Sequence, residues 1–271
     1  MTTPIALTIA GSDSGGGAGI QADLKTFSAL GVYGASVITA LTAQNTREVR
    51  AIFDVDPEFI AAQIDTLFDD LAIDAIKIGM LSRPEVIEVV ARRLSARGAP
   101  NLVLDPVMVA KSGDRLLRDE AVAALREILL PMAAVVTPNL PEAAVLLGRE
   151  GLEDEADMAV TARGILDLGA KAVLLKGGHL DGAESCDYFT DGQAERLFSA
   201  PRIATKNTHG TGCTLSSAIA ANLALGHPLI EAIGAAKAYV SQAIAAADRL
   251  IVGSGHGPVH HFHALWPRRR D

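Results

Sequence analysis

The sequence is poor in cysteine and has no long uninterrupted hydrophobic run. Only Cys186 and Cys213 occur among 271 residues, whereas small secreted domains held by disulfides are dense in cysteine. No stretch approaches the roughly 18 apolar residues that a membrane-spanning helix needs. The sequence therefore excludes a disulfide scaffold and predicts a protein that makes no use of the membrane.

An excess of positive charge is also absent. The 24 lysines and arginines are outnumbered by 32 acidic residues, and the net charge is −8. Because a nucleic-acid-binding face needs cations to neutralise phosphates, we expect no nucleic-acid partner. The one basic cluster, Arg268 to Arg270, is expected to be a solvated tail. No export signal precedes Lys25, so we expect a cytoplasmic protein with both thiols reduced.

What the chain does have is a composition suited to a large core. Hydrophobic residues make up 49% and charged residues 21%, and a chain of this length buries about 70–75% of the surface that its unfolded form exposes. Disorder as the main state is therefore excluded. No linker, internal repeat or shift in composition divides the chain, so we expect residues 1–271 to form a single domain, although the length alone would allow two.

Short apolar runs alternate with longer amphipathic segments along the chain. Strands are expected at 5–10, 32–39, 75–79, 102–105, 134–137 and 172–176. Helices are expected at 19–30, 57–71, 84–97, 120–130, 155–168, 214–225 and 229–250. Strands that are apolar throughout and joined by helices predict a mainly parallel sheet between two helical layers, a three-layer αβα sandwich of the α/β class.

Turn residues refine this fold. Asp191-Gly192 separates two β-like segments, 185–190 and 194–199, and this dipeptide is a strong hairpin signal. We expect an antiparallel hairpin at one edge of the sheet. Glycines are expected to end five helices: Gly31, Gly98, Gly148, Gly169 and Gly226.

Polar residues and glycines follow the predicted strands where these end. The segments concerned are Gly11 to Gly19, Gly79-Met80, Asp105-Pro106, Thr137 to Glu142 and Lys176 to His179. The carboxyl ends of parallel strands meet at one edge, and ligands bind there in open α/β sheets. We therefore expect the ligand site at this edge.

The glycine-rich segment from Gly11 to Gly19 matches no standard nucleotide motif. It lacks the Gly-Lys-Ser/Thr ending of a Walker A loop, and Ile20 stands where a dinucleotide fingerprint would place its last glycine. A P-loop NTPase and a Rossmann dehydrogenase are therefore disfavoured. The glycines still allow the backbone to come close to a ligand.

The strongest local signal runs from Asn207 to Thr214. Gly210 and Gly212 free the backbone where a helix is expected to begin, and the positive end of a helix with free amides is an anion site. The same setting is expected to lower the pKa of the Cys213 thiol. Cys186, in a predicted strand, is expected to be a packing residue.

Asp105 and Glu142 are candidates to hold Mg²⁺, which takes one or two carboxylates and completes its shell with water and phosphate. Lys176 offers a fixed positive charge. Phosphoryl transfer needs little more than positioning, a metal and charge stabilisation. The histidine-rich segment 256–263 fits no standard zinc spacing, so these histidines are expected to be structural or solvated.

These motifs together resemble the hydroxymethylpyrimidine/phosphomethylpyrimidine kinases of thiamin biosynthesis, in the ribokinase-like superfamily. The resemblance covers almost the whole chain. It is carried by segments 9–23, 39–46, 77–80, 104–108, 137–143, 175–179, 209–216 and 255–263.

The resemblance implies an ATP- and Mg²⁺-dependent kinase, with a homodimer as the typical assembly. It would phosphorylate 4-amino-5-hydroxymethyl-2-methylpyrimidine and then the monophosphate, giving the diphosphate. The substrate would be bound by Gln44, Gly11, Ala18, Asp23, Met80 and Val107, the carboxamide of Gln44 offering a donor and an acceptor to the aminopyrimidine. The ATP ligands would be Asn139, Lys176, Thr208 and His209, and the Mg²⁺ ligands Asp105 and Glu142. The anion hole would be formed by Gly210, Thr211, Gly212 and Cys213.

Most sugar kinases of this superfamily carry an aspartate base at the position of Cys213. A thiol with a lowered pKa would accept the hydroxymethyl proton in the first step, while the second acceptor is already an ionised phosphate. Three alternatives stay open. The first is a pyridoxine or pyridoxal kinase, since some relatives with the same cysteine act on that ring. The others are a non-catalytic ligand sensor and a thiol hydrolase in which His209 assists Cys213.

Overall fold

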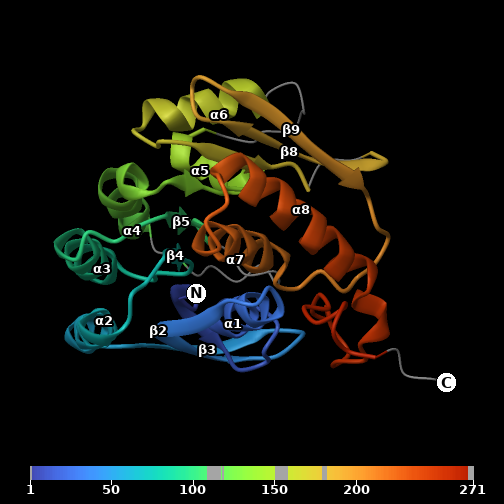
Figure 1. Cartoon of the computed structure of the whole chain (residues 1–271), viewed down its shortest axis with the longest axis horizontal. Coiled ribbons are helices and arrows are strands. Elements are labelled where there is room, and N and C mark those ends of the chain that lie inside the picture. Colours follow the sequence, from blue (N-terminus) through green and yellow to red (C-terminus); the bar gives the residue numbers. More distant parts are fainter. Residues whose placement is uncertain (1, 109–116, 118, 150–157, 179–181, 268–271) are drawn as a thin grey trace.

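A nine-stranded sheet organises the part of the chain that the computed structural model describes, residues 2–108, 117, 119–149, 158–178 and 182–267 (Figure 1). The strand order is β3-β2-β1-β4-β5-β6-β7-β8-β9. The strands run β1 Ile5–Asp13, β2 Tyr33–Gln44, β3 Val49–Asp54, β4 Ala75–Ile78, β5 Leu102–Leu104, β6 Val135–Val136, β7 Val173–Lys176, β8 Glu184–Thr190 and β9 Glu195–Pro201. Strand β1 pairs with β2 on one side and with β4 on the other. The chain therefore adds β2 and β3 on one side of β1, and then all later strands on the other side.

The centre of the sheet is parallel and both edges are antiparallel. Strands β2, β1, β4, β5, β6 and β7 pair in parallel. The predicted hairpin is confirmed as β8 and β9, which pair antiparallel beside β7. At the other edge β3 pairs antiparallel with β2. The sequence interpretation missed this strand, because four of its six residues are exposed and it carries little hydrophobic signal.

Helices cover both faces, so the three-layer prediction is confirmed. Helices α1 Gly19–Ala29, α7 Thr211–Ala224 and α8 Leu229–Ala245 lie on one face. The opposite face carries α2 Pro57–Asp70, α3 Pro84–Ala96, α4 Asp119–Ala124, α5 Leu140–Leu147 and α6 Met158–Asp167. Short irregular turns follow α4 and α8, at Leu125–Leu129, Leu130–Met132 and Ala247–Arg249.

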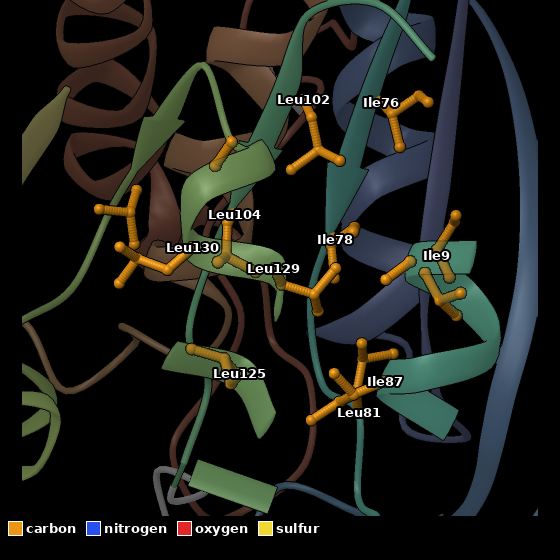
Figure 2. Packing of buried hydrophobic residues seen from close by; sticks show 14 of the residues in the cluster. Ile9, Ile76, Ile78, Leu81, Ile87, Leu102, Leu104, Leu125, Leu129 and Leu130 are labelled. Atoms are coloured by element: carbon orange, nitrogen blue, oxygen red, sulfur yellow. The ribbon is translucent and has the colours of Figure 1, made fainter. Parts of the chain in front are cut away.

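The strands send alternate side chains into two separate cores. Ile76 and Ile78 of β4 enter the core under α2 and α3, whereas Ala75 enters the core under α1, α7 and α8. Figure 2 shows the first core, where Leu102 and Leu104 of β5 lie beside the β4 isoleucines. Burial on both faces explains why these strands read as continuous apolar runs.

Helix boundaries agree with the glycine signals. Each of the five glycines expected to end a helix has a positive φ, from 61° at Gly98 to 101° at Gly169. The predicted helix at 120–130 is wrong in detail, since α4 stops at Ala124 and a wider turn follows. The predicted helix at 214–225 begins three residues earlier, at Thr211. The first residues of the helix expected at 155–168, and the basic cluster at 268–270, lie outside the described residues.

Helix α5 was not predicted, although its signal is present. Asn139 accepts a hydrogen bond from the Glu142 amide, and Glu142 accepts one from the Asn139 amide. This reciprocal capping box, followed by proline in the first turn, is a recognised helix start. Among the described helices, none is long and apolar enough to cross a membrane.

Candidate active site

The parallel strands bring the predicted polar residues to one edge of the sheet. Asp105 directly follows β5, and Lys176 is the last residue of β7. The Lys176 Nζ lies 2.9 Å from Asp105 Oδ1 and 3.7 Å from Glu142 Oε2. A Cβ built on Gly212 would lie 3.4 Å from Lys176 Nζ and 3.8 Å from Asp105 Oδ2. Thus residues from three strand ends and the head of α7 meet at one place.

Asp105 is fixed by further hydrogen bonds. The hydroxyl of Thr137, after β6, donates to Asp105 Oδ1 at 3.2 Å. The hydroxyl of Ser216, one turn into α7, donates to Oδ2 at 3.2 Å. The carboxylate is 1% exposed, so its orientation is set by protein groups.

The charges at this place do not balance. Burial alone would raise the pKa of Asp105, but the charges of Lys176 and Lys77 outweigh it and hold that pKa below its usual range. Burial, reinforced by the Asp105 charge, raises the pKa of Glu142 to about 7 against the pull of Lys176. For Lys176, burial is outweighed by both carboxylates, which raise its pKa. Two carboxylates therefore share one nearby ammonium group.

This donor set suits a divalent cation with bound phosphates. Magnesium prefers oxygen ligands and uses only one or two carboxylates when phosphates and water complete its shell. Burial is the main cause of the raised pKa of Glu142, so a bound cation would stabilise its charged form. Asp105 and Glu142 together fit the predicted metal role, and Asn139, held by the capping box, fixes the position of Glu142.

The head of α7 presents the backbone amides of Gly212 and Cys213, while the Thr211 amide donates to the Thr208 carbonyl at 3.3 Å. Gly210 is the N-cap, with φ of +79°, and Thr211, Gly212 and Cys213 form the first turn. The first amides of a helix have no partner within it and carry partial positive charge. The Thr211 hydroxyl donates to the Thr208 carbonyl, which steadies the turn before the helix. The predicted anion site at 210–213 thus coincides with the N-cap and first turn of α7.

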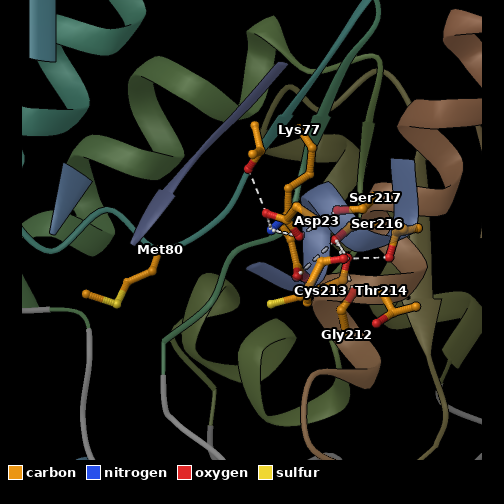
Figure 3. Close-up of polar contacts among 12 residues, drawn as sticks. Asp23, Lys77, Met80, Gly212, Cys213, Thr214, Ser216 and Ser217 are labelled. Atoms are coloured by element: carbon orange, nitrogen blue, oxygen red, sulfur yellow. Dashed lines mark hydrogen bonds and ion pairs between the residues drawn. The ribbon is translucent and has the colours of Figure 1, made fainter. Parts of the chain in front are cut away.

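The sequence interpretation of Cys213 as an acidic thiol is wrong in direction. Burial raises the pKa of Cys213 to about 11, and the nearby Lys77 charge only partly opposes it. The backbone N–H of Gly19 donates to the sulfur. In Figure 3 the sulfur points toward the side on which Met80 lies, and the residue keeps partial exposure. Desolvation outweighs the helix end in setting this pKa.

Asp23 also differs from its predicted role of lining the substrate pocket. It is fully buried, and its oxygens accept hydrogen bonds from Thr8 at 2.6 Å, Ser217 at 2.6 Å and Lys77 at 2.8 and 3.0 Å. Figure 3 shows this pair above Cys213. Because both partners are 0% exposed, Asp23 lies beneath the surface of the site and offers no face to a ligand.

The residues predicted to bind the pyrimidine lie around the end of β1. A Cβ built on Gly11 would lie 3.5 Å from the Met80 sulfur. Gln44 ends β2, and its Oε1 accepts a hydrogen bond from Thr42 at 3.0 Å. Ser14 of the glycine-rich loop bonds both backbone groups of Gln44 at 2.9 Å. Of the other two residues predicted to bind the pyrimidine, Ala18 lies next to Gly210. Val107 lies two residues after Asp105, and its amide donates a hydrogen bond to the Asp105 carbonyl.

His209 is not placed as a ligand for ATP. Its side chain is largely buried, and Nε2 lies 2.9 Å from Asp13 Oδ2. The same contact speaks against the thiol hydrolase alternative, because this ring nitrogen is engaged by a carboxylate and does not serve Cys213. Thr208, also predicted for ATP, is half-buried in the turn before α7.

Other candidate groups have structural roles. His261 is buried against α7, where Nε2 lies 3.1 Å from the Thr214 hydroxyl, and burial lowers its pKa to about 3. His260 and His263 contact the rings of Trp266 and Tyr239. Cys186 is buried in β8 as expected. Within the described residues, no group of three or more potential ligands could hold a metal ion.

A surface hollow of about 490 Å³ lies elsewhere, between α2 and α3. It is lined by Pro57, Glu58, Ala61, Glu85, Glu88, Val89, Arg92 and Arg93. None of the sequence-predicted site residues is among them, so the candidate site is identified by its chemistry and not by this hollow.

Comparison with known proteins adds to this geometry. A family model described as phosphomethylpyrimidine kinase matches residues 13–260. The chain belongs to the phosphomethylpyrimidine kinase family. It is 64% identical to the hydroxymethylpyrimidine/phosphomethylpyrimidine kinase of Rhizobium meliloti (strain 1021) over 97% of this chain and 99% of that protein.

Two solved structures in this family's fold illustrate its range. The crystal structure of phosphomethylpyrimidine kinase from Clostridium difficile 630 is 47% identical, with a TM-score of 0.78 over 89% of this chain and 99% of that chain. An ADP complex of Bacillus subtilis pyridoxal kinase is 41% identical, with a TM-score of 0.89 over 96% of this chain and 98% of that chain. The ribokinase-like fold expected from the sequence is thus confirmed.

Proposed function

We propose that this chain transfers a phosphoryl group from ATP to 4-amino-5-hydroxymethyl-2-methylpyrimidine, and then a second one to the monophosphate. The observation that carries the proposal is the meeting of Lys176, Asp105 and Glu142 with the head of α7. The strong similarity to kinases named for these two reactions supports the substrate.

The charge of the migrating phosphoryl group is met by fixed groups. The amides of Gly212 and Cys213 and the ammonium of Lys176 would provide positive charge at one place without rearrangement, whereas the Thr211 amide is already bonded to the Thr208 carbonyl. Preorganised donors of this kind stabilise a transition state more than flexible ones. Lys176 is held by Asp105 before any ligand arrives.

The two carboxylates would hold Mg²⁺. When bound, this ion neutralises the ATP phosphates and the developing charge on the leaving group. Asp105 and Glu142 face Lys176 from two neighbouring strand ends. Asn139 and Thr208 are proposed to contact the nucleotide, because they flank the same edge.

The pyrimidine is proposed to lie at the end of β1, on the other side of the α7 head. Gln44 would bind the ring edge, while Gly11, Ala18, Met80 and Val107 would line the ring faces. Met80 is a polarisable side chain suited to a flat heterocycle.

Cys213 is proposed to assist the first step only. With a pKa of about 11, the Cys213 thiol is almost entirely protonated at neutral pH. Only its small thiolate fraction would accept the hydroxymethyl proton, as the hydroxymethyl oxygen bonds to phosphorus and the bond from phosphorus to the leaving ADP oxygen breaks. The second acceptor is an ionised phosphate and needs no such help. We also propose that residues 1–271 form a single kinase domain, which is supported by the one sheet that all described strands share, and that the protein works in the cytoplasm.

A homodimer is also proposed. It is supported by apolar side chains exposed along the β2–β3 edge, among them Leu41, Ile52 and Phe53, the last 71% exposed. Light scattering during gel filtration checks the mass, and a monomer at working concentration contradicts the assembly.

The deciding experiment follows mono- and diphosphate separately, with the hydroxymethylpyrimidine, ATP and Mg²⁺ as reactants. Pyridoxal is assayed beside it, because the Bacillus subtilis pyridoxal kinase is so similar in fold. We expect kcat/KM to favour the pyrimidine. A preference for pyridoxal would support the second function, and no transfer to either ring would overturn both.

Cys213→Ala separates the two steps. We expect the first step to slow by about 10²–10⁴-fold, the range typical of general acid–base catalysis, and the second to change little. An unchanged first step removes the proposed role of the thiol.

A further inference from the structure

Asp13, the last residue of β1, organises the glycine-rich loop. Its Oδ1 accepts a hydrogen bond from the amide of Gly15 at 2.8 Å, and its Oδ2 accepts from the amides of Gly17 and Ala18 at 3.0 and 2.9 Å. The Asp13 side chain is only 4% exposed. A single carboxylate therefore fixes the path of the loop that leads into α1.

The same carboxylate also contacts the segment before α7. Asp13 Oδ2 lies 2.9 Å from His209 Nε2, across 196 residues of sequence. His209 is itself held through its backbone, since its amide donates to Gly257 and its carbonyl accepts from Val259. The imidazole is thus anchored on one side by the C-terminal segment and reaches the loop on the other.

The two segments are interlocked as well as bonded. A Cβ on Gly17 would lie 2.3 Å from His209 Cδ2, and a Cβ on Gly210 would lie 1.9 Å from the Gly17 carbonyl oxygen. Gly210 also has a φ of +79°, which disfavours other residues. The glycines at 17 and 210 are required by this close approach, which places the loop against the N-cap of α7.

The contact continues to the reacting groups. Ala18, held by Asp13, precedes Gly19, whose backbone N–H donates to the Cys213 sulfur. Gly210, seated on Gly17, begins the turn that carries the proposed anion-hole amides. We propose that Asp13 and His209 form a positioning pair that sets the distance between the substrate-side loop and the anion hole.

This inference rests on the proposed kinase function, and it gives His209 a positioning role through Asp13 in place of the ATP contact expected from the sequence. The charged or titratable groups that face the pair include Lys25 and His261, whose ring interacts electrostatically with His209. Lys25 donates to the Gly16 carbonyl at 2.7 Å, and the Asp13 and Lys25 charges attract each other. The pair acts by geometry, because a displacement of about 1 Å at a reacting centre costs up to about 10²-fold in rate.

The test compares two replacements of His209. Gln places an amide nitrogen near the position of Nε2 and can still donate to Asp13, whereas His209→Leu fills similar space without a donor. We expect His209→Leu to lower kcat for the first step by about 10- to 100-fold, with the KM for ATP within threefold. His209→Gln is expected to keep kcat within about fivefold of the parent value. Asp13→Asn is tested alone and in combination with His209→Leu. We expect the double variant to lose little more kcat than the His209→Leu variant alone.

A second measurement does not depend on kinase activity. Release of the loop removes the Gly19 N–H from Cys213, so the thiol becomes more accessible. We expect iodoacetamide to modify Cys213 severalfold faster in His209→Leu and Asp13→Asn than in the parent or His209→Gln, as followed by peptide mass spectrometry with Cys186 as internal reference. This readout stands even if the parent protein phosphorylates neither ring, in which case only the proposed function fails.

The matched control is His261→Leu. His261 is also buried and also reaches α7, through the Thr214 hydroxyl, but it does not contact the glycine-rich loop. We expect lower thermal stability in this variant, with kcat and Cys213 alkylation near the parent values. Three results overturn the proposal: an unchanged kcat and alkylation rate in His209→Leu, a rise in KM for ATP alone, or equal effects in His261→Leu. If His209→Leu does not fold, Asp13→Asn against the parent decides by the same readouts.

Discussion

Two lysine–aspartate contacts lie near the head of α7, and they differ in the balance of charge around them. Lys77 and Asp23 are both 0% exposed and pair at 2.8 Å, with Thr8 and Ser217 donating to the same carboxylate. Lys176 and Asp105 pair at 2.9 Å, but Lys176 is 13% exposed and a second carboxylate, Glu142, lies 3.7 Å away. The first contact is closed and neutral, and the second is open and has excess negative charge.

The difference separates a structural pair from a ligand site. Burial alone would lower the pKa of Lys77, but Asp23 outweighs it and raises that pKa, so the pair stays ionised. At the open site, burial and the Asp105 charge raise the pKa of Glu142, and the charge of Lys176 only partly opposes them. A closed pair with satisfied hydrogen bonds holds elements together, whereas an unbalanced one can accept a cation and its phosphates.

The largest effect is expected from breaking the closed pair. Lys77→Met leaves the Asp23 carboxylate buried without its cation, which costs about 3–5 kcal/mol of unfolding free energy. Urea unfolding followed by circular dichroism measures the loss. The double variant with Asp23→Asn removes both charges and is expected to recover part of that stability. If Lys77→Met unfolds like the parent, the pair is not the structural element described here.

Breaking the open contact is expected to affect catalysis more than folding. Lys176→Met removes a fixed charge from the phosphoryl site and should lower kcat by about 10²–10³-fold, as for the loss of one donor to a transition state. Its stability loss should be smaller than that of Lys77→Met, because Glu142 can take up a proton near neutral pH. Steady-state kinetics and urea unfolding of the same samples check both parts. A larger stability loss than in Lys77→Met would contradict the contrast.

A smaller effect is expected in the pH dependence of stability. The pKa of Glu142 is raised from 4.5 to about 7 in the folded protein, so between these values the folded state binds more protons than the unfolded state. This carboxyl therefore contributes stability that is full below about pH 4.5 and is lost as the pH rises to about 7. Melting temperatures of ligand-free protein across this range should show a Glu142-dependent fall. Glu142→Gln should remove that component, and an identical slope in both proteins would refute the assignment.

Much of this contrast could be predicted from residue types and order. Apolar strands ending in Asp105 and Lys176 placed both residues at one edge, because parallel strands share the direction of their ends. The glycines before Cys213 predicted the head of α7. Those inferences needed only local sequence patterns and the rule that parallel strands end at the same edge of a sheet.

Other features depended on contacts that local patterns do not contain. Asp23 and Lys77 lie 54 residues apart, so their pairing, which buries Asp23, had no local sign. The direction of the Cys213 pKa was wrong because desolvation is a property of the packed site. His209 was assigned to ATP through the family resemblance, and its contact with Asp13, 196 residues away, had no local sign. The missed helix α5 is different, since its capping box was visible in Asn139 and Glu142.

Helix α7 joins the anion site directly to the interior. After its half-buried first turn, every residue from Thr214 to Leu223 is buried, and five of these ten residues are alanine or serine. Small side chains let the helix lie close to the sheet, so there is no slack to absorb a larger residue at Ala218 or Ala221. A random mutational screen for lost turnover should consequently recover substitutions on the later turns of this helix, well away from any substrate. Such variants would be mistaken for damaged ligand contacts unless their melting temperatures were measured as well.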